Sequence, residues 1–459
     1  MLRSQPIKHR ELSHMSNNLS KPPYRPAFAI DSLLNFSTQI VIFVLSLVSS
    51  IIIARSLGPQ GKGVYSLAIL IPTLIASIVS MGINSANVYF IGTKKFSINK
   101  ILSNALAYSL LVGITFTLLF QLTIITYNLF SAKVIQILYF IVASPMIILL
   151  LVLDNINYTF LANRQIWHFS SVRFLRIFFY VAILVFLYLF FSFSVLKAIF
   201  ANIGGLLFAI FLGFYLLNKQ KYITKPRLNL QVFKEVIKFG YKQHLGSVFQ
   251  LLNYRVDMLI VVALLSESEL GLYSISVVIA ETVWYLPNAI GQILFAKVAS
   301  ETDESANKFT PLVCRTIIII IILGCLMLYA LADILIPLLF TSSFSASILP
   351  LKLLLPGILF LSISKIIGSD LSGRGFPHYS SIASGVALIV TVVFDLLFIP
   401  IFGINGAALA SSISYMVNAA VVLYFFKKTS GISINDILII KASDFFEYKK
   451  IFISFKPSF

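Results

Sequence analysis

Long apolar runs separated by short polar segments make up most of the chain. Twelve runs are long enough to cross a bilayer, because a membrane helix needs about 20 mostly apolar residues. They lie near 33–54, 64–90, 101–125, 134–153, 172–193, 198–217, 244–265, 271–295, 312–331, 349–367, 380–400 and 406–426. This pattern predicts an all-α integral membrane protein with twelve transmembrane helices.

The composition agrees with a lipid environment. Of the 459 residues, 58% are apolar and only 11% are charged, whereas about a quarter of a soluble domain is charged. The formal net charge is +18, but the basic residues lie in short loops and form no nucleic-acid-binding motif, which argues against nucleic acid as a partner. The two cysteines share one apolar run and the five histidines are scattered, so no disulfide framework or metal site is predicted.

The basic residues alternate from side to side along the chain. If the N-terminal segment is placed inside, the inside segments hold 29 of the 35 Lys and Arg, the outside loops hold four, and two fall within runs. Because basic residues in short loops set the orientation, both termini are predicted to be cytoplasmic. The same bias supports the number twelve, since a missed helix would invert every later segment.

The longest internal loop divides the runs into two sets of six. We expect a disordered basic cytoplasmic tail at 1–30, a six-helix lobe at 31–217, a basic cytoplasmic linker at 218–243, a second six-helix lobe at 244–426 and a cytoplasmic tail at 427–459. A short motif recurs between the halves, since Gly63-Val64-Tyr65-Ser66 returns as Gly271-Leu272-Tyr273-Ser274. An even number of helices per half makes the repeat parallel, with its pseudo-axis along the membrane normal.

Three motifs carry a family resemblance. They are Ala54-Arg55-Ser56-Leu57-Gly58-Pro59 with the Gly63-Val64-Tyr65-Ser66 that follows it, the turn Gly373-Arg374-Gly375-Phe376-Pro377, and Phe402-Gly403-Ile404-Asn405-Gly406-Ala407-Ala408. Together they resemble the Wzx-type flippases of O-antigen and related repeat units, a family in the superfamily that also holds the multidrug and toxin extrusion exporters. The motifs supply turns and small packing residues, so they identify the family without forming a binding site.

The resemblance implies two six-helix lobes around a central cavity that opens alternately to each side. It implies transport rather than catalysis, so no catalytic residue and no cofactor are expected. Coupling of transport to protons or sodium is a separate hypothesis. The implied substrate is a polyprenyl-pyrophosphate-linked oligosaccharide, moved from the cytoplasmic to the outer leaflet of a bacterial inner membrane for surface polysaccharide biosynthesis. The implied partners are this substrate, the membrane lipids and polysaccharide polymerase machinery.

Ionisable side chains inside the runs are the candidates for substrate binding, because each costs at least about 2.5–3.5 kcal/mol to insert. The candidates are Arg173 and Arg176 in the fifth run, Arg255 and Asp257 in the seventh, Glu281 in the eighth, Lys352 and Lys365 in the tenth, and Asp395 in the eleventh. Arg255 lies eleven residues before Ser266, and Glu281 lies eleven residues after Leu270. Both are thus roughly 16 Å deep, so they can pair near the midplane.

Two interpretations of these charges remain open. Arg255 either forms a structural ion pair with Glu281, or faces the cavity and binds pyrophosphate while Glu281 or Asp257 holds it. Lys352 and Asp395 lie near the outside boundary and can pair in the same way, unless Lys352 snorkels to the interface.

The remaining candidates lie near the inside face. Lys365, Arg173 and Arg176 either attract the anionic headgroup of the substrate or serve as ordinary positive-inside anchors. The acids within the runs lie in the second half, with Asp154 placed at a helix end. If transport is ion-coupled, the coupling carboxylate is therefore expected in the second lobe, and Asp257→Asn tests this hypothesis.

Three other functions fit the sequence less well. An exporter of drugs or small amphiphiles is the closest, although arginines in a cavity would repel cationic drugs. A membrane glycosyltransferase or polymerase needs acidic or basic side chains in a large outside loop, but the longest such loop holds only Asp333. A major-facilitator sugar transporter would carry an Asp-Arg-rich loop at 92–100, which this chain lacks.

Overall fold

The computed structural model describes residues 26–130, 137–222, 225–439, 441 and 444. Over these residues the chain is helical and contains no strand. The α-helices are α1 (Pro26–Val79), α2 (Ile83–Gly92), α3 (Ile98–Phe130), α4 (Ile137–Ala143), α5 (Met146–Ala162), α6 (Ile166–Phe190), α7 (Val195–Lys219), α8 (Leu230–Asn253), α9 (Val256–Leu264), α10 (Glu267–Ala280), α11 (Tyr285–Ser300), α12 (Asp303–Phe340), α13 (Ile348–Gly373), α14 (Pro377–Phe402), α15 (Ile404–Ser430) and α16 (Ile434–Leu438). Two short 3₁₀ helices are η2 (Glu281–Trp284) and η3 (Ser342–Ser347).

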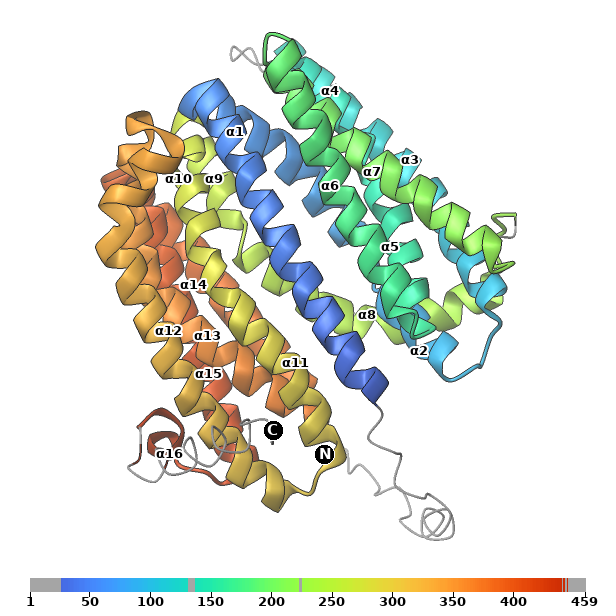
Figure 1. The fold of residues 1–459 in the computed structure, drawn as a ribbon, viewed down its shortest axis with the longest axis vertical. Coiled ribbons are helices and arrows are strands. Elements are labelled where there is room, and N and C mark those ends of the chain that lie inside the picture. The colour runs from blue at the N-terminus through green and yellow to red at the C-terminus, as the bar shows by residue number, and fades with distance from the viewer. Residues whose placement is uncertain (1–25, 131–136, 223–224, 440, 442–443, 445–459) are drawn as a thin grey trace, which may run out of the picture.

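The described helices provide twelve passes through a bilayer. Ten are long and apolar enough to span, and the bent pair α8–α9 makes eleven. The longest of them, Leu34–Val79, has 46 residues, which is about 69 Å of helix and more than twice the thickness of a bilayer core. It breaks at Gly58, where φ is 64° and ψ is −175°. Helix α1 therefore makes two passes, here called its first and second arms, and turns at one end of the bundle (Figure 1).

Side chains at the helix ends explain where several helices start and stop. Ser194, Ser266 and Thr302 are N-caps, and each side-chain oxygen accepts a hydrogen bond from the backbone N–H three residues further on. Pro377 stands in the first turn of α14, where its missing N–H is not needed. Gly431 ends α15 in the left-handed conformation, with φ of 73°.

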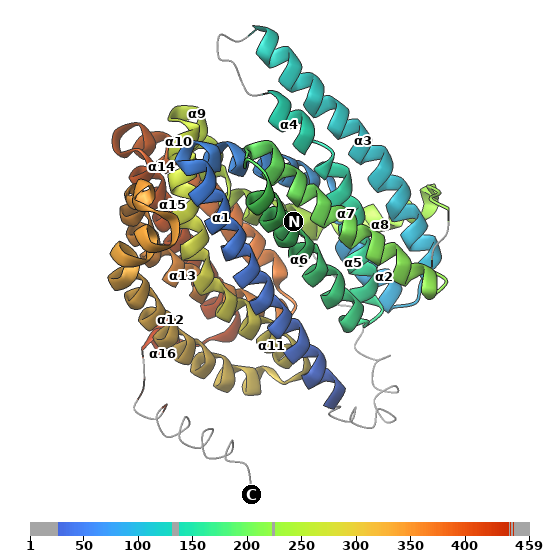
Figure 2. The same ribbon diagram turned by 45° about the horizontal axis from the view of Figure 1, so that its top comes forward.

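Two hydrophobic cores divide the molecule into two lobes. One core is built from residues between 53 and 217, and the other is built almost entirely from residues between 258 and 437. Helices α3–α7 lie on one side and α9–α15 on the other, with the first arm of α1 between them (Figures 1 and 2). The predicted all-helical, two-lobed architecture is thus present.

The repeated motif of the two halves forms a contact between the lobes. The second arm of α1 packs against α10, and a Cβ on Gly63 would lie 2.6 Å from the carbonyl carbon of Glu267. A Cβ on Gly271 would lie 2.8 Å from the carbonyl carbon of Pro59. The two serines of the motif face each other at 3.4 Å. Only glycine leaves room for backbones this close, so the motif brings the lobes together at the predicted outside end.

The predicted tail and linker are more helical than the sequence suggested. Helix α1 begins at Pro26, so the last residues of the 1–30 tail belong to it, while 1–25 lie outside the described residues. Residues 230–243 of the predicted linker form the first half of α8. That half carries lysines at positions 234 and 238, a spacing that places them on one side of the helix with apolar residues on the other, which suits a helix lying at a membrane boundary.

The segment after α15 is tied to the second lobe. Ile437 of α16 is fully buried. Arg315 of α12 donates to both carboxylate oxygens of Asp444, at 2.6 and 2.7 Å, and also to the carbonyl oxygen of Asp436. A buried bidentate ion pair is strong only when its geometry is good, as here, so this part of the predicted tail has a fixed position. Residues 445–459 lie outside the described residues.

Candidate functional site

A cavity of about 840 Å³ lies between the two lobes. Its walls come from α1, α5 and α6 of the first lobe and from α8, α11, α13, α14 and α15 of the second. The lining residues lie toward the helix ends that meet the turns at 163–165 and 374–376, which are predicted to be cytoplasmic. The opposite end is closed by the contact between Gly63 and Gly271. The cavity therefore occupies the half of the bundle on the predicted cytoplasmic side.

Amide and serine side chains supply half of the cavity wall, 12 of 24 residues. The amides are Asn35, Gln39, Asn157, Gln250, Asn288, Gln292 and Asn418, and the hydroxyls are Ser364, Ser369, Ser372, Ser380 and Ser384. Among the described residues, Oδ1 of Asn157 and Oγ of Ser380 are buried without a hydrogen-bond partner. Buried polar atoms are normally paired, so these two atoms are available to a ligand.

Helical spacing gathers these polar residues on the cavity side. Asn35 and Gln39 are four residues apart on α1, and Asn288 and Gln292 are four apart on α11. On α13 the lining positions are 361, 364, 365, 368, 369 and 372. Residues three and four apart share one face of a helix, so the polar lining residues of each helix form a stripe that faces the cavity.

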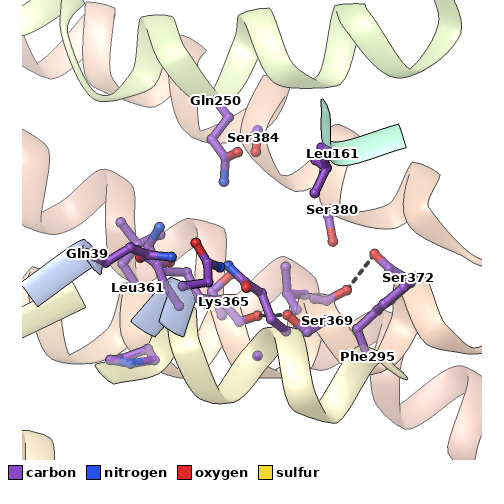
Figure 3. A pocket seen from close by; sticks show the side chains of 18 of the residues that line it. Gln39, Leu161, Gln250, Phe295, Leu361, Lys365, Ser369, Ser372, Ser380 and Ser384 are labelled. Atoms are coloured by element: carbon purple, nitrogen blue, oxygen red, sulfur yellow. Dashed lines mark hydrogen bonds between the residues drawn. The ribbon is translucent and has the colours of Figure 1, made fainter. Parts of the chain in front are cut away.

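The polar stripes face each other across the cavity. Gln250 and Ser384 lie on one wall, and Lys365, Ser369 and Ser372 of α13 lie on the wall opposite (Figure 3). A ligand between these walls would meet donors and acceptors on both sides, because amides and hydroxyls supply both.

Three formally charged side chains line the cavity, and two of them are cations. Arg173 of α6 donates to Oδ1 of Asn35 at 3.4 Å, and its guanidinium lies 5.0 Å from the ring centroid of Phe169. Nζ of Lys365 lies 4.7 Å from the ring of Trp284, in a cation–π contact. The third is Asp154, so the wall carries more positive than negative charge and favours an anion.

Asp154 lies elsewhere than the sequence suggested. It was placed at a helix end, but α5 continues to Ala162, so Asp154 lies well inside the membrane part of the first lobe. The expectation that acids within the membrane belong to the second half alone is therefore wrong. The prediction failed because polar residues after Asp154 interrupt the apolar run, and this interruption resembled the end of a helix. In the structure, polar residues of this segment line a cavity instead.

Arg255 and Glu281 form the ion pair that their equal depth predicted. Nη1 and Nη2 of Arg255 donate to the two carboxylate oxygens of Glu281 at 2.7 and 3.0 Å. Neither residue lines the cavity. The aromatic rings of Tyr254, Trp284 and Tyr415 pack together beside the pair. That Arg255 contacts substrate stays a prediction.

Asp257 and Asp395 are buried inside the second lobe. Asp257 accepts hydrogen bonds from Tyr273 Oη at 2.7 Å, Ser411 Oγ at 3.0 Å and its neighbour's backbone N–H at 2.7 Å. Asp395 is fully buried, and neither of its carboxylate oxygens has a hydrogen-bond partner among the described residues. The two carboxylates are close enough to interact electrostatically. Asp395 therefore does not pair with Lys352, which instead donates to Asp333 at 2.6 Å.

Arg176 belongs to a polar network inside the first lobe. It does not line the cavity, and it lies within electrostatic reach of Asp154 and Tyr65. Tyr65 Oη lies 2.8 Å from Tyr180 Oη and accepts a hydrogen bond from Asn202 at 3.0 Å. Of the eight predicted site residues, only Arg173 and Lys365 line the cavity.

Sequence reasoning missed the amides and serines because it selected charges. The signal was present as uncharged polar pairs at four-residue spacing in apolar runs, such as Asn288 and Gln292. An amide in a membrane helix needs a partner or a water-filled cavity, so such a pair marks a polar face. Among the described residues, no group of acidic, histidine or cysteine side chains is arranged to hold a metal ion.

Comparisons with known sequences match the chain to proteins of polysaccharide biosynthesis. The family described as "Polysaccharide biosynthesis protein" matches residues 52–349. The chain is 25% identical over 419 residues to the "Capsular polysaccharide biosynthesis protein CapF" of Staphylococcus aureus, with 86% of this chain and 99% of CapF covered.

Comparisons with solved structures establish the fold. The chain is similar to the lipid II flippase MurJ in an inward closed conformation, with a TM-score of 0.69, 17% identity, and 92% of this chain and 93% of MurJ covered. It is also similar to an inward-facing multidrug resistance MATE family transporter of the MOP superfamily, with a TM-score of 0.67, 15% identity, and 87% and 98% covered. These relatives are a flippase and a transporter rather than enzymes. The predicted multi-pass, two-lobed membrane fold is thereby confirmed.

Proposed function

The chain belongs to the polysaccharide biosynthesis protein family, and from this membership we propose that it is a flippase for polyprenyl-pyrophosphate-linked oligosaccharides. It moves repeat units from the cytoplasmic to the outer leaflet of a bacterial inner membrane, with both of its termini in the cytoplasm. A polysaccharide polymerase that consumes the flipped units is the expected downstream partner.

The observation that carries this proposal is the polar wall of the cavity. Sugar hydroxyls both donate and accept hydrogen bonds, and the amides and serines of the wall supply the matching acceptors and donors. A site for a hydrophobic drug would be mostly apolar with few polar groups, whereas half of this wall is amide or serine.

The two cations of the wall suit the pyrophosphate. Arg173 offers a planar fork of donors and Lys365 offers a compact ammonium, and both chemistries recognise phosphate. The cavity lies in the half of the bundle on the predicted cytoplasmic side, where a lipid-linked sugar built in the cytoplasm would enter. Release on the other side requires the lobes to part at Gly63 and Gly271, which supports alternating access.

A transport assay in vesicles tests the proposal. The protein is reconstituted with a polyprenyl-pyrophosphate-linked oligosaccharide, and arrival of the glycan in the opposite leaflet is followed by its cleavage with an added glycosidase. Lys365→Gln and Asn288→Leu each remove one ligand-facing polar group, so we expect flipping to slow by about tenfold or more. The control Lys352→Gln also removes one cation, but outside the cavity, and should leave the rate unchanged.

The same assay distinguishes a flippase from an exporter of drugs or small amphiphiles. Transport of a cationic amphiphilic dye without flipping of the glycolipid would replace the flippase by an exporter. Equal effects of the Lys365 and Lys352 variants would show that the cavity is not the substrate path.

We further propose that transport is coupled to protons or sodium through Asp257 and Asp395. A buried carboxylate without a partner costs several kcal/mol if ionised, so Asp395 either holds a proton or shares a cation with Asp257. The test compares the dependence of flipping on pH and on sodium in the wild type and in Asp257→Asn and Asp395→Asn, with Asp333→Asn as the surface control. An unchanged dependence in both buried variants would count against coupling at this site.

A further inference from the structure

A second pocket lies on the first lobe, away from the central cavity. Its volume is about 570 Å³, and it shares no lining residue with the central cavity. It is formed by the first turns of α3 and by the loop 225–229 that leads into α8. Both segments are at the predicted cytoplasmic side, on the part of the molecule shown at the right of Figure 2 near the labels α3 and α8.

The charge of this pocket is entirely positive. Lys100, Lys225 and Arg227 line it, and no carboxylate does. Within the described part of the chain, none of these three cations forms an ion pair. Glu235 of α8 is paired with Lys95 and does not line the pocket. Three uncompensated cations around one hollow create a strongly positive potential that favours an anion.

The pocket is held in shape by buried hydrogen bonds. Ser103 Oγ of α3 donates to the carbonyl oxygen of Lys225 at 2.6 Å and accepts from the backbone N–H of Arg227 at 2.9 Å. Oδ1 of Asn104 accepts from the backbone N–H of Asn229 at 2.9 Å. Ser103 and Asn104 are both buried. The loop is therefore fastened to α3, and the two cations that it carries have fixed starting points beside Lys100.

The same side of α3 continues into the bilayer. Leu111 and Leu118 lie eleven and eighteen residues after Lys100, which places all three on one face of the helix. Both leucines are 59% exposed, as expected for side chains that meet lipid tails. Leu111 lies about 16 Å along the helix from Lys100, within one leaflet.

We propose that this pocket binds the phosphate headgroup of an anionic phospholipid, whose acyl chains lie along the exposed face of α3. A positive hollow at the membrane boundary, on the same side of α3 as a lipid-facing stripe that begins at Leu111, fits a molecule that is anionic at one end and apolar along the rest. Arg227 supplies the bidentate fork that phosphate oxygens accept, and the two lysines supply further charge. The site is separate from the substrate cavity, so it holds whether or not the proposed transport activity is correct.

Native mass spectrometry of the purified protein with added lipid tests this site. The probes are phosphatidylglycerol and phosphatidylcholine with the same acyl chains. We expect the wild type to prefer phosphatidylglycerol, and Lys225→Gln/Arg227→Gln to weaken that binding by about 30-fold, since each interfacial cation contributes about fivefold. The matched control is Lys427→Gln/Lys428→Gln, which removes two exposed cations at the end of α15 and should leave the binding unchanged.

Three results would overturn the proposal. They are an equal loss in the control variant, equal binding of the two lipids by the wild type, and equally tight binding of soluble glycerophosphoglycerol, which would make the ligand a free phosphate ester. The thermal melting temperature of each variant shows that it folds. Arg227→Lys, which keeps the charge and loses the fork, should retain part of the binding.

Discussion

The contact between Gly63 and Gly271 predicts how a single methyl group would shift the conformation of the protein. In Gly271→Ala the new Cβ would stand 2.8 Å from the carbonyl carbon of Pro59. A carbon pair needs about 3.5 Å, so this contact alone requires the second arm of α1 and α10 to separate by about 0.7 Å, and the still closer carbonyl oxygen of Pro59 requires a larger separation. Overpacking of this kind costs about 1–3 kcal/mol. The cost falls only on the state in which this end is closed.

The expected result is a shift of population toward the state that opens at the Gly63–Gly271 end. A difference of about 2 kcal/mol changes the ratio of two states by about 30-fold. Accessibility of the cavity to a membrane-impermeant maleimide measures this ratio. Both native cysteines are buried and can be replaced, after which Gln39→Cys supplies one reporter on the cavity wall.

In Gly271→Ala, the maleimide should label the reporter cysteine less from the predicted cytoplasmic side, where the cavity lies, and more from the predicted outside. The matched control is Gly324→Ala, because a Cβ there would meet nothing within 4 Å. It carries the same glycine-to-alanine change in a helix and should label like the parent. Unchanged labelling in Gly271→Ala from both sides would refute the idea that this contact closes the protein.

Three further predictions follow from the buried polar contacts. Arg255→Ala should abolish transport and lower the melting temperature, since it leaves Glu281 unpaired at a cost on the order of 3 kcal/mol. The double variant Arg255→Gln/Glu281→Gln should regain the melting temperature but not transport. Full transport by either variant would show that the pair is purely structural. Arg315 holds the pKa of the Asp444 carboxyl below its ordinary value of 3.8, so the ion pair should stabilise α16 fully above pH 3.8 and be lost as the pH falls through the lower, folded-state pKa; hydrogen-exchange protection of α16 measures this, and pH-independent protection would contradict it. Tyr65→Phe should destabilise the first lobe by about 1–3 kcal/mol, measured by thermal melting in detergent, because it removes the hydrogen bonds of Tyr65 Oη with Tyr180 and Asn202.

The architecture could be predicted from the sequence because lipid imposes strong rules. Twelve apolar runs and one-sided basic loops follow from the cost of placing polar groups in hydrocarbon. The Arg255–Glu281 pair could be predicted for the same reason, since two opposite charges at equal depth have few other partners. These predictions rest on distances along single helices, which the sequence fixes through the helical rise.

The cavity could not be predicted in the same way. Which side of a helix faces a cavity depends on how the helices pack. Lys352 shows the difficulty, because Asp333 and Asp395 both lie at a depth that it could reach. In the structure it pairs with Asp333. Asp154 was assigned to a helix end because polar residues near a cavity resemble polar residues near water. Depth can be read from a sequence, but the rotation of each helix requires the folded structure.

The glycine contact also bears on the origin of the chain. Gly63 and Gly271 belong to copies of one motif, and the copies touch each other rather than separate partners. A surface that meets its own copy about a two-fold axis is isologous, which is the usual interface of a homodimer. A six-helix ancestor carrying this motif would have dimerised through the same glycine face before the two genes fused. In the present chain, each copy of the motif must then evolve under the constraint of the other.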